Sequence, residues 1–195
     1  MGSAIILRKE PINSCRFPNL LFPTNWFGSY LQNNCTEPIP SLIICLIIMI
    51  ESIPYITIFL LCTIGVISVS GFSNYSVIEY MRHYPYQEHR DKSYYRWLSC
   101  GFVHGSYIHL ILNAFVLWQF GFVIEKMYIA KFGSVPGMSI YLSAYLLILI
   151  LSCVPTYIKH KNNSSYASIG ASGAISGILF IYIYHFPNAI LSLYG

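Results

Sequence analysis

Long apolar stretches without charged side chains alternate with short polar segments along this chain. A membrane-spanning helix needs about 20 predominantly apolar residues. Ser52 as N-cap and Pro54 in the first turn suit the start of a first spanning helix, and Pro187 suits the end of the last. We therefore expect an all-α fold, a polytopic membrane bundle of about four helices. The pattern predicts these spans at about 53–72, 98–124, 138–157 and 166–185.

Composition supports a membrane protein and excludes several other classes. Hydrophobic residues make up 55% of the chain and charged residues only 9%, against about 45–50% and 25% in soluble domains. So little charge cannot cover a soluble globule, and a disordered chain would need low hydrophobicity. The net charge of +4 is scattered, with no basic run that could follow a phosphate backbone. A soluble enzyme, a linker and a nucleic-acid partner are therefore excluded.

The first 48 residues differ from the rest of the chain. They are rich in proline, and the apolar patch 42–50 is too short to span a membrane. The segment lacks the ordered regions and cleavage site of a signal peptide. Met49 stands directly before the first span. We expect 1–48 to be a dispensable leader and 49–195 to form the bundle, so that N-terminal sequencing of natural protein would begin near Met49 rather than Met1.

The cysteines give no sign of a disulfide framework or a metal site. Six cysteines occur, without a C-x-x-C motif and without paired spacing. This pattern predicts small apolar residues that face helix neighbours, rather than a disulfide network or a metal site. No acidic cluster joins the histidines of the second span, so we expect neither a metal nor another cofactor.

Polar side chains inside the predicted spans require an explanation, because they are costly in lipid unless they are paired. The second span holds His104, His109 and Asn113, and the last two lie four residues apart on one helical face. Such residues often only join helices by hydrogen bonds. Near the predicted start of the fourth span, Ser172 stands between glycines, where free backbone N–H groups are close to its hydroxyl.

These two groups of residues resemble the motifs of one family, the rhomboid intramembrane serine proteases. The first motif is His104-x4-His109-x3-Asn113, and the second is the tetrapeptide Gly170-Ala171-Ser172-Gly173. Two further residues agree. Arg96 matches the arginine of the family's Trp-Arg pair, with Tyr95 in place of the tryptophan, and Glu125 matches a glutamate that binds loop backbone. The resemblance covers about residues 53–195.

The resemblance implies a helical bundle around a water-filled cavity and a hydrolase, a serine-type endopeptidase that cleaves transmembrane segments of membrane proteins. Ser172 would be the nucleophile. Asn113, His109 and the backbone N–H of Ser172 would stabilise the oxyanion. Such a protein would be a multi-pass integral protein in lipid contact, in the plasma (inner) membrane of a bacterium. The residues in supporting roles would be His104, Gly170, Gly173, Arg96 and Glu125.

The chain departs from the family pattern at the catalytic base. Rhomboid proteases carry a histidine in an Ala-His-x-x-Gly setting on a sixth span, and no such motif occurs here. His185 follows Ser172 on the same predicted helix, roughly 20 Å along the axis, which is too far for a hydrogen bond. We therefore expect a protease that lacks spans five and six. The alternative is a non-catalytic rhomboid-like protein that binds transmembrane helices; a transporter is disfavoured because the four spans hold no charge.

Overall fold

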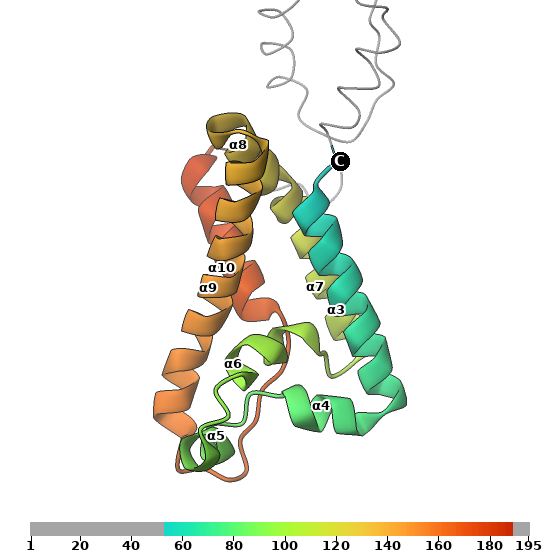
Figure 1. Ribbon diagram of the computed structural model, residues 1–195, viewed down its shortest axis with the longest axis vertical. Coiled ribbons are helices and arrows are strands. Elements are labelled where there is room, and N and C mark those ends of the chain that lie inside the picture. The colour runs from blue at the N-terminus through green and yellow to red at the C-terminus, as the bar shows by residue number, and fades with distance from the viewer. Residues whose placement is uncertain (1–52, 189–195) are drawn as a thin grey trace, which may run out of the picture. The chain divides into compact units, whose positions relative to one another are not determined.

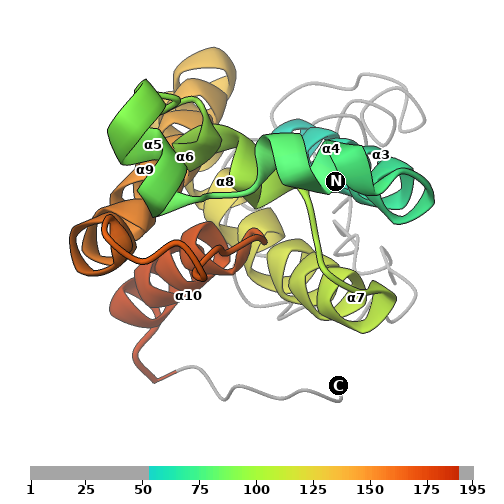
Figure 2. The ribbon, with the colours of Figure 1, turned by 90° about the horizontal axis from the view of Figure 1, so that it is seen from below.

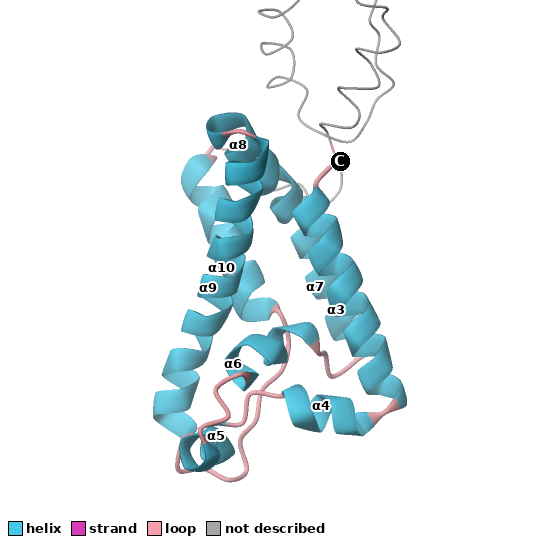
Figure 3. Cartoon of the chain, in the orientation of Figure 1, coloured by secondary structure: helices cyan, strands magenta, loops and turns pink. Residues whose placement is uncertain are grey.

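The computed structural model describes residues 53–188. The predicted leader 1–48 and the predicted N-cap Ser52 lie outside the described residues. Figures 1 and 3 show that the described part is built of helices joined by short loops. In chain order the elements are α3 (Tyr55–Ser73), α4 (Tyr75–Met81), α5 (Pro85–Asp91), α6 (Arg96–Ser99), the 3-10 turn η1 (Cys100–Phe102), α7 (Tyr107–Val116), the π-helical turn η2 (Leu117–Gly121), α8 (Phe122–Phe132), α9 (Ser134–His160) and α10 (Ser172–His185).

The predicted all-α membrane bundle is confirmed. Within residues 53–188, three helices are long and apolar enough to cross a membrane: α3, the continuous helix Tyr107–Phe132 and α9. The fourth predicted span is α10, which has only 14 residues. It begins at Ser172 rather than near 166 because Gly170 adopts φ +115° just before it, a backbone conformation that no helix can contain.

The second predicted span, 98–124, is wrong at both ends. Its first residues form α6, η1 and an extended stretch, and helix α7 begins only after Ser106, whose side chain accepts a hydrogen bond from the His109 N–H. At the other end the helix continues through Glu125 to Phe132. A charged residue does not end the helix there, because the Glu125 carboxylate is fully buried and hydrogen bonded.

The long connection between the first two spans is itself helical. Figure 1 and the perpendicular view in Figure 2 show α4, α5 and α6 together at one end of the described bundle. The loop before α10 returns to this same end, where His83 and Ser168 form an antiparallel bridge through their backbones. The bridge brings the first loop into contact with the segment that leads to Ser172.

Close packing of α9 against α8 and α10 depends on glycines. A Cβ on Gly137, near the start of α9, would lie 2.6 Å from backbone atoms of Ile129 in α8. Gly173 and Gly177 of α10 face Ser152 and Ile148 of α9, and a side chain at either glycine would clash with them. These glycines therefore allow α9 to pack closely against α8 and α10.

Candidate active site

Ser172 is the first residue of α10, and its side chain is exposed. Gly170, two residues earlier, has φ +115°, a conformation that L side chains rarely adopt. A Cβ at this glycine would also lie 2.6 Å from Cε1 of the His109 ring. Backbone conformation and space thus both require glycine at this position. The first N–H groups of a helix have no acceptor within it, so Ser172 lies among free donors.

Four hydrogen bonds hold the segment that leads to Ser172. The backbone of Ser168 exchanges both of its hydrogen bonds with His83, at 2.9 and 3.0 Å. The Gly170 N–H donates to the carbonyl of Cys100 at 2.9 Å. The Ala171 N–H donates to Nε2 of His104 at 3.3 Å. The position of Ser172 is therefore determined by the first loop and by the residues before α7.

His104 is fully buried beneath this segment. Because Nε2 accepts from Ala171, the ring proton resides on Nδ1, which lies 2.9 Å from Oγ of Ser68. The Ser68 hydroxyl in turn donates to the carbonyl of Phe102. Burial, with a smaller effect of the neighbouring His109, lowers the pKa of His104 to about 4. A neutral His104 therefore supports the Ser172 segment.

His109 and Asn113 lie on one face of α7, as their spacing predicts. The His109 ring packs edge-on against His104, with 4.9 Å between the ring centres, and lies directly against Gly170. Asn113 is 8% exposed, and its Nδ2 donates to the His109 carbonyl at 3.0 Å. An amide nitrogen carries two N–H groups, so this bond uses one of two donors.

The supporting residue Glu125 binds a helix end. Its carboxylate accepts hydrogen bonds from the backbone N–H groups of Ile56 (2.9 Å) and Thr57 (2.8 Å) and from the Thr57 hydroxyl (2.7 Å). The resemblance implies a bond to loop backbone; here the acceptor serves the first turn of α3. A negative charge at a helix N-terminus is favourable because it satisfies free donors and complements the helix dipole.

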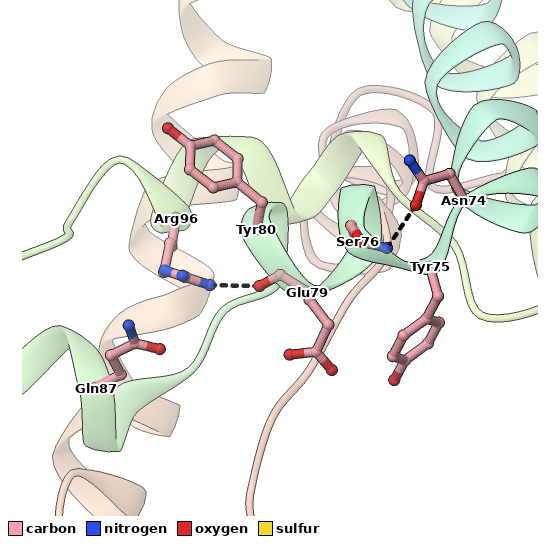
Figure 4. A pocket seen from close by; sticks show the side chains of 7 residues that line it. All are labelled: Asn74, Tyr75, Ser76, Glu79, Tyr80, Gln87 and Arg96. Atoms are coloured by element: carbon pink, nitrogen blue, oxygen red, sulfur yellow. Dashed lines mark hydrogen bonds between the residues drawn. The ribbon is translucent and has the colours of Figure 1, made fainter.

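Arg96, also predicted as a supporting residue, organises the first loop. Its Nη1 donates to the carbonyls of Glu79 (2.8 Å) and Arg82 (3.1 Å), and only 6% of the residue is exposed. Figure 4 shows the side chain at the edge of an open pocket of about 480 Å³. The residues that line this pocket are Asn74, Tyr75, Ser76, Glu79, Tyr80, Gln87 and Arg96.

Sequence reasoning missed a buried polar network in the same loop. Glu88 is completely buried and accepts hydrogen bonds from His83 Nδ1 (2.9 Å), from the Tyr84 N–H (2.6 Å) and from Trp97 Nε1 (2.8 Å). No sequence signal distinguishes Glu88 from the charged residues around it. Sequence reasoning also missed Ser68. A signal for it exists, since it shares a helical face with the other buried residues of α3. These are Thr57, Leu60, Ile64, Ser68 and Gly71.

The histidines do not complete a catalytic dyad. All six lie within residues 53–188, and none is hydrogen bonded to Ser172 in this part of the chain. His83 and His104 are buried in other hydrogen bonds, and His160 stacks on Tyr166. Over the same residues, no group of three or more His, Cys, Asp or Glu side chains is placed to hold a metal ion.

Fold and site together define an integral membrane protein of several apolar helices with a serine at the start of a short apolar helix. The family model described as "Rhomboid domain" matches residues 91–194, more than half of the chain. The chain belongs to the rhomboid family. It is 31% identical over 102 residues to the Rhomboid protease GlpG of Haemophilus influenzae, an alignment that covers 52% of this chain and 47% of that protein. The chain thus spans about half the length of the curated relative that it matches.

Proposed function

We propose that this chain carries the nucleophile and the oxyanion donors of an intramembrane serine endopeptidase. The observation that carries the proposal is the placement of Ser172: it is exposed at the first position of α10, and His104 and the first loop hold the residues directly before it. A serine nucleophile requires an open hydroxyl and donors aimed at the developing negative charge. The start of a helix offers both.

In this mechanism the Ser172 Oγ attacks the carbonyl carbon of a peptide bond. The backbone N–H of Ser172, the second Nδ2–H of Asn113 and the His109 ring stabilise the oxyanion that forms. His104 accepts from the Ala171 N–H and so keeps the peptide before Ser172 in place. Proton removal from Ser172 needs a general base, and none of the six histidines matches the family's catalytic histidine. The proposal for this chain therefore covers the nucleophile and the oxyanion donors.

The proposed substrates are transmembrane segments of other membrane proteins, which reach Ser172 from the bilayer. The apolar helices of this chain support that route, because a substrate helix and the protein share one solvent. The relative from Haemophilus influenzae is bacterial, which supports placement in the inner membrane of a bacterium.

One observation favours a second candidate function. Since no described histidine is bonded to Ser172, the chain could bind transmembrane helices without cutting them. The two functions differ in one measurable property, the reactivity of the Ser172 hydroxyl.

The experiment is labelling of the detergent-solubilised chain with a fluorophosphonate probe, which forms a covalent bond only with an activated serine. Because no described histidine is bonded to Ser172, a second form carries an appended rhomboid-type fifth and sixth span with the family's histidine. In that form we expect labelling that is lost in Ser172→Ala and retained in Ser176→Ala, since Ser176 is also exposed and lies one turn later on α10. Asn113→Ala should slow labelling by about 10²–10³, the usual effect of removing one oxyanion donor.

Equal labelling of Ser172→Ala and wild type would refute the assignment of the nucleophile. No labelling of either form, together with photo-crosslinking to a synthetic transmembrane peptide, would establish the helix-binding function instead. No labelling and no crosslinking would overturn both.

A further inference from the structure

Two cysteines that are far apart in the sequence meet inside the bundle. Cys100 lies in η1 and Cys153 in α9, and their sulfur atoms are 3.8 Å apart. Their exposed fractions are 4% and 5%. A disulfide has an S–S distance of about 2.05 Å, so closing the bond requires a shift of roughly 2 Å. Neither thiol takes part in the chemistry proposed for Ser172.

Both sulfur atoms lie near the same backbone carbonyl group. Each thiol lies near the carbonyl oxygen of Trp97, at 3.7 Å for Cys100 and 3.5 Å for Cys153. The neighbouring Gly101 allows η1 to lie directly on α9, because a Cβ there would be 2.5 Å from Cδ2 of Leu149. Leu149 is one turn before Cys153, and its carbonyl accepts from the Cys153 thiol. Direct contact between η1 and α9 at Gly101 and Leu149 thus accompanies the close approach of the two sulfur atoms.

The pair lies under the segment that carries Ser172. The carbonyl of Cys100 accepts from the Gly170 N–H at 2.9 Å. On α9, Ser152 adjoins Cys153 and faces Gly173 of α10. A disulfide between the two cysteines would therefore link η1 to α9. These two elements contact Gly170 and Gly173, which lie on either side of Ser172.

We propose that Cys100 and Cys153 form an oxidation site, a reversible disulfide that links the first loop to α9. Oxidation forms one S–S bond and breaks two S–H bonds. The two electrons and two protons pass to a hydrogen acceptor of the quinone or diazene class, which is reduced to the hydroquinone or the hydrazine. A dithiol reduces the bond again by thiol–disulfide exchange.

Burial makes this reaction slow. The contact with the Cys153 thiol, together with burial, raises the pKa of the Cys100 thiol above its ordinary value. The thiolate is the reactive form in oxidation and exchange, so the buried, protonated Cys100 thiol reacts slowly. A time course of hours, with a small oxidant, is the appropriate test.

The test uses a chain in which Cys15, Cys35, Cys45 and Cys62 are replaced by serine. The folded protein in mild detergent is treated with diamide for up to a day, denatured, and alkylated with N-ethylmaleimide. We expect the intact mass to show no adducts after oxidation and two adducts after reduction with dithiothreitol. Cys100→Ala in the same background is the matched control and should carry one adduct in both states.

Two adducts after a full day of oxidation, or a disulfide-linked dimer on a non-reducing gel, would overturn the proposal. Should the serine background fail to fold, peptide mapping of the oxidised wild-type chain answers the same question: a linked Cys100–Cys153 peptide supports the site, and its absence overturns it. The readout is a mass and needs no peptidase activity, so its failure is distinct from a failure of the proposed function.

Discussion

Replacing Glu125 with alanine removes the carboxylate that accepts three hydrogen bonds, two of them buried, at the start of α3. Hydrogen bonds to a charged group contribute about 1.5–3 kcal/mol each, and such contributions within one network are not additive. The substitution leaves the N–H groups of Ile56 and Thr57 without their acceptor, while the Thr57 hydroxyl keeps only its longer contact with the Tyr141 hydroxyl at 3.3 Å. We expect a loss of about 3–5 kcal/mol, because each buried donor left without an acceptor costs about 1–3 kcal/mol, from a total stability of about 5–15 kcal/mol.

The assay is unfolding of the detergent-solubilised protein by sodium dodecyl sulfate, followed by far-ultraviolet circular dichroism. Glu125→Gln should lose about half as much stability as Glu125→Ala, because its amide oxygen still accepts while its NH₂ group faces other donors. Glu79→Gln is the matched control. Its carboxylate is 42% exposed in a surface ion pair with Arg82, which contributes about 0–1 kcal/mol. Equal midpoints for Glu125→Ala and Glu79→Gln would refute the reasoning.

Two other predictions concern packing and pH. Gly137→Ala should destabilise the protein by about 1–3 kcal/mol, because its Cβ would meet the backbone of α8. Gly65→Ala, whose added Cβ meets nothing within 4 Å, should be neutral or stabilising by up to about 1 kcal/mol. The same unfolding assay compares the stabilities of the two variants. Equal losses of stability would contradict the packing argument. The folded pKa of His104 is about 4, below the ordinary 6.5, so between these values the unfolded chain binds more protons and stability falls as the pH falls. Melting temperatures of wild type and His104→Gln should therefore converge as the pH is lowered from 7 to about 4; parallel curves would exclude this contribution.

The helical membrane class was predictable from the sequence because lipid leaves a chain few choices. Backbone groups must be satisfied within each segment, so long apolar stretches become helices. The boundaries were less predictable. Charge counting places the end of the second span at 124, and the helix continues to Phe132 because the Glu125 charge is compensated by the distant start of α3.

The candidate site divides in the same way. The spacing of His109 and Asn113 predicts a shared face, and the Gly-Ala-Ser-Gly tetrapeptide predicts an open serine near a helix start. Neither pattern shows that His104 lies before the helix rather than inside it. The helical face of α3 indicates that Ser68 is buried but not that its partner is His104, and no pattern indicates that Glu88 is buried.

Local chemistry in the sequence determined the membrane class, the helical fold and the residues that resemble a serine protease site. These features depend on the period of a helix and on the cost of polar groups in lipid. The tertiary structure decided which distant groups meet: Glu125 with the start of α3, His104 with Ala171, and Cys100 with Cys153. Such contacts arise only when helices pack, because the residues involved are separated by more than 50 positions along the chain.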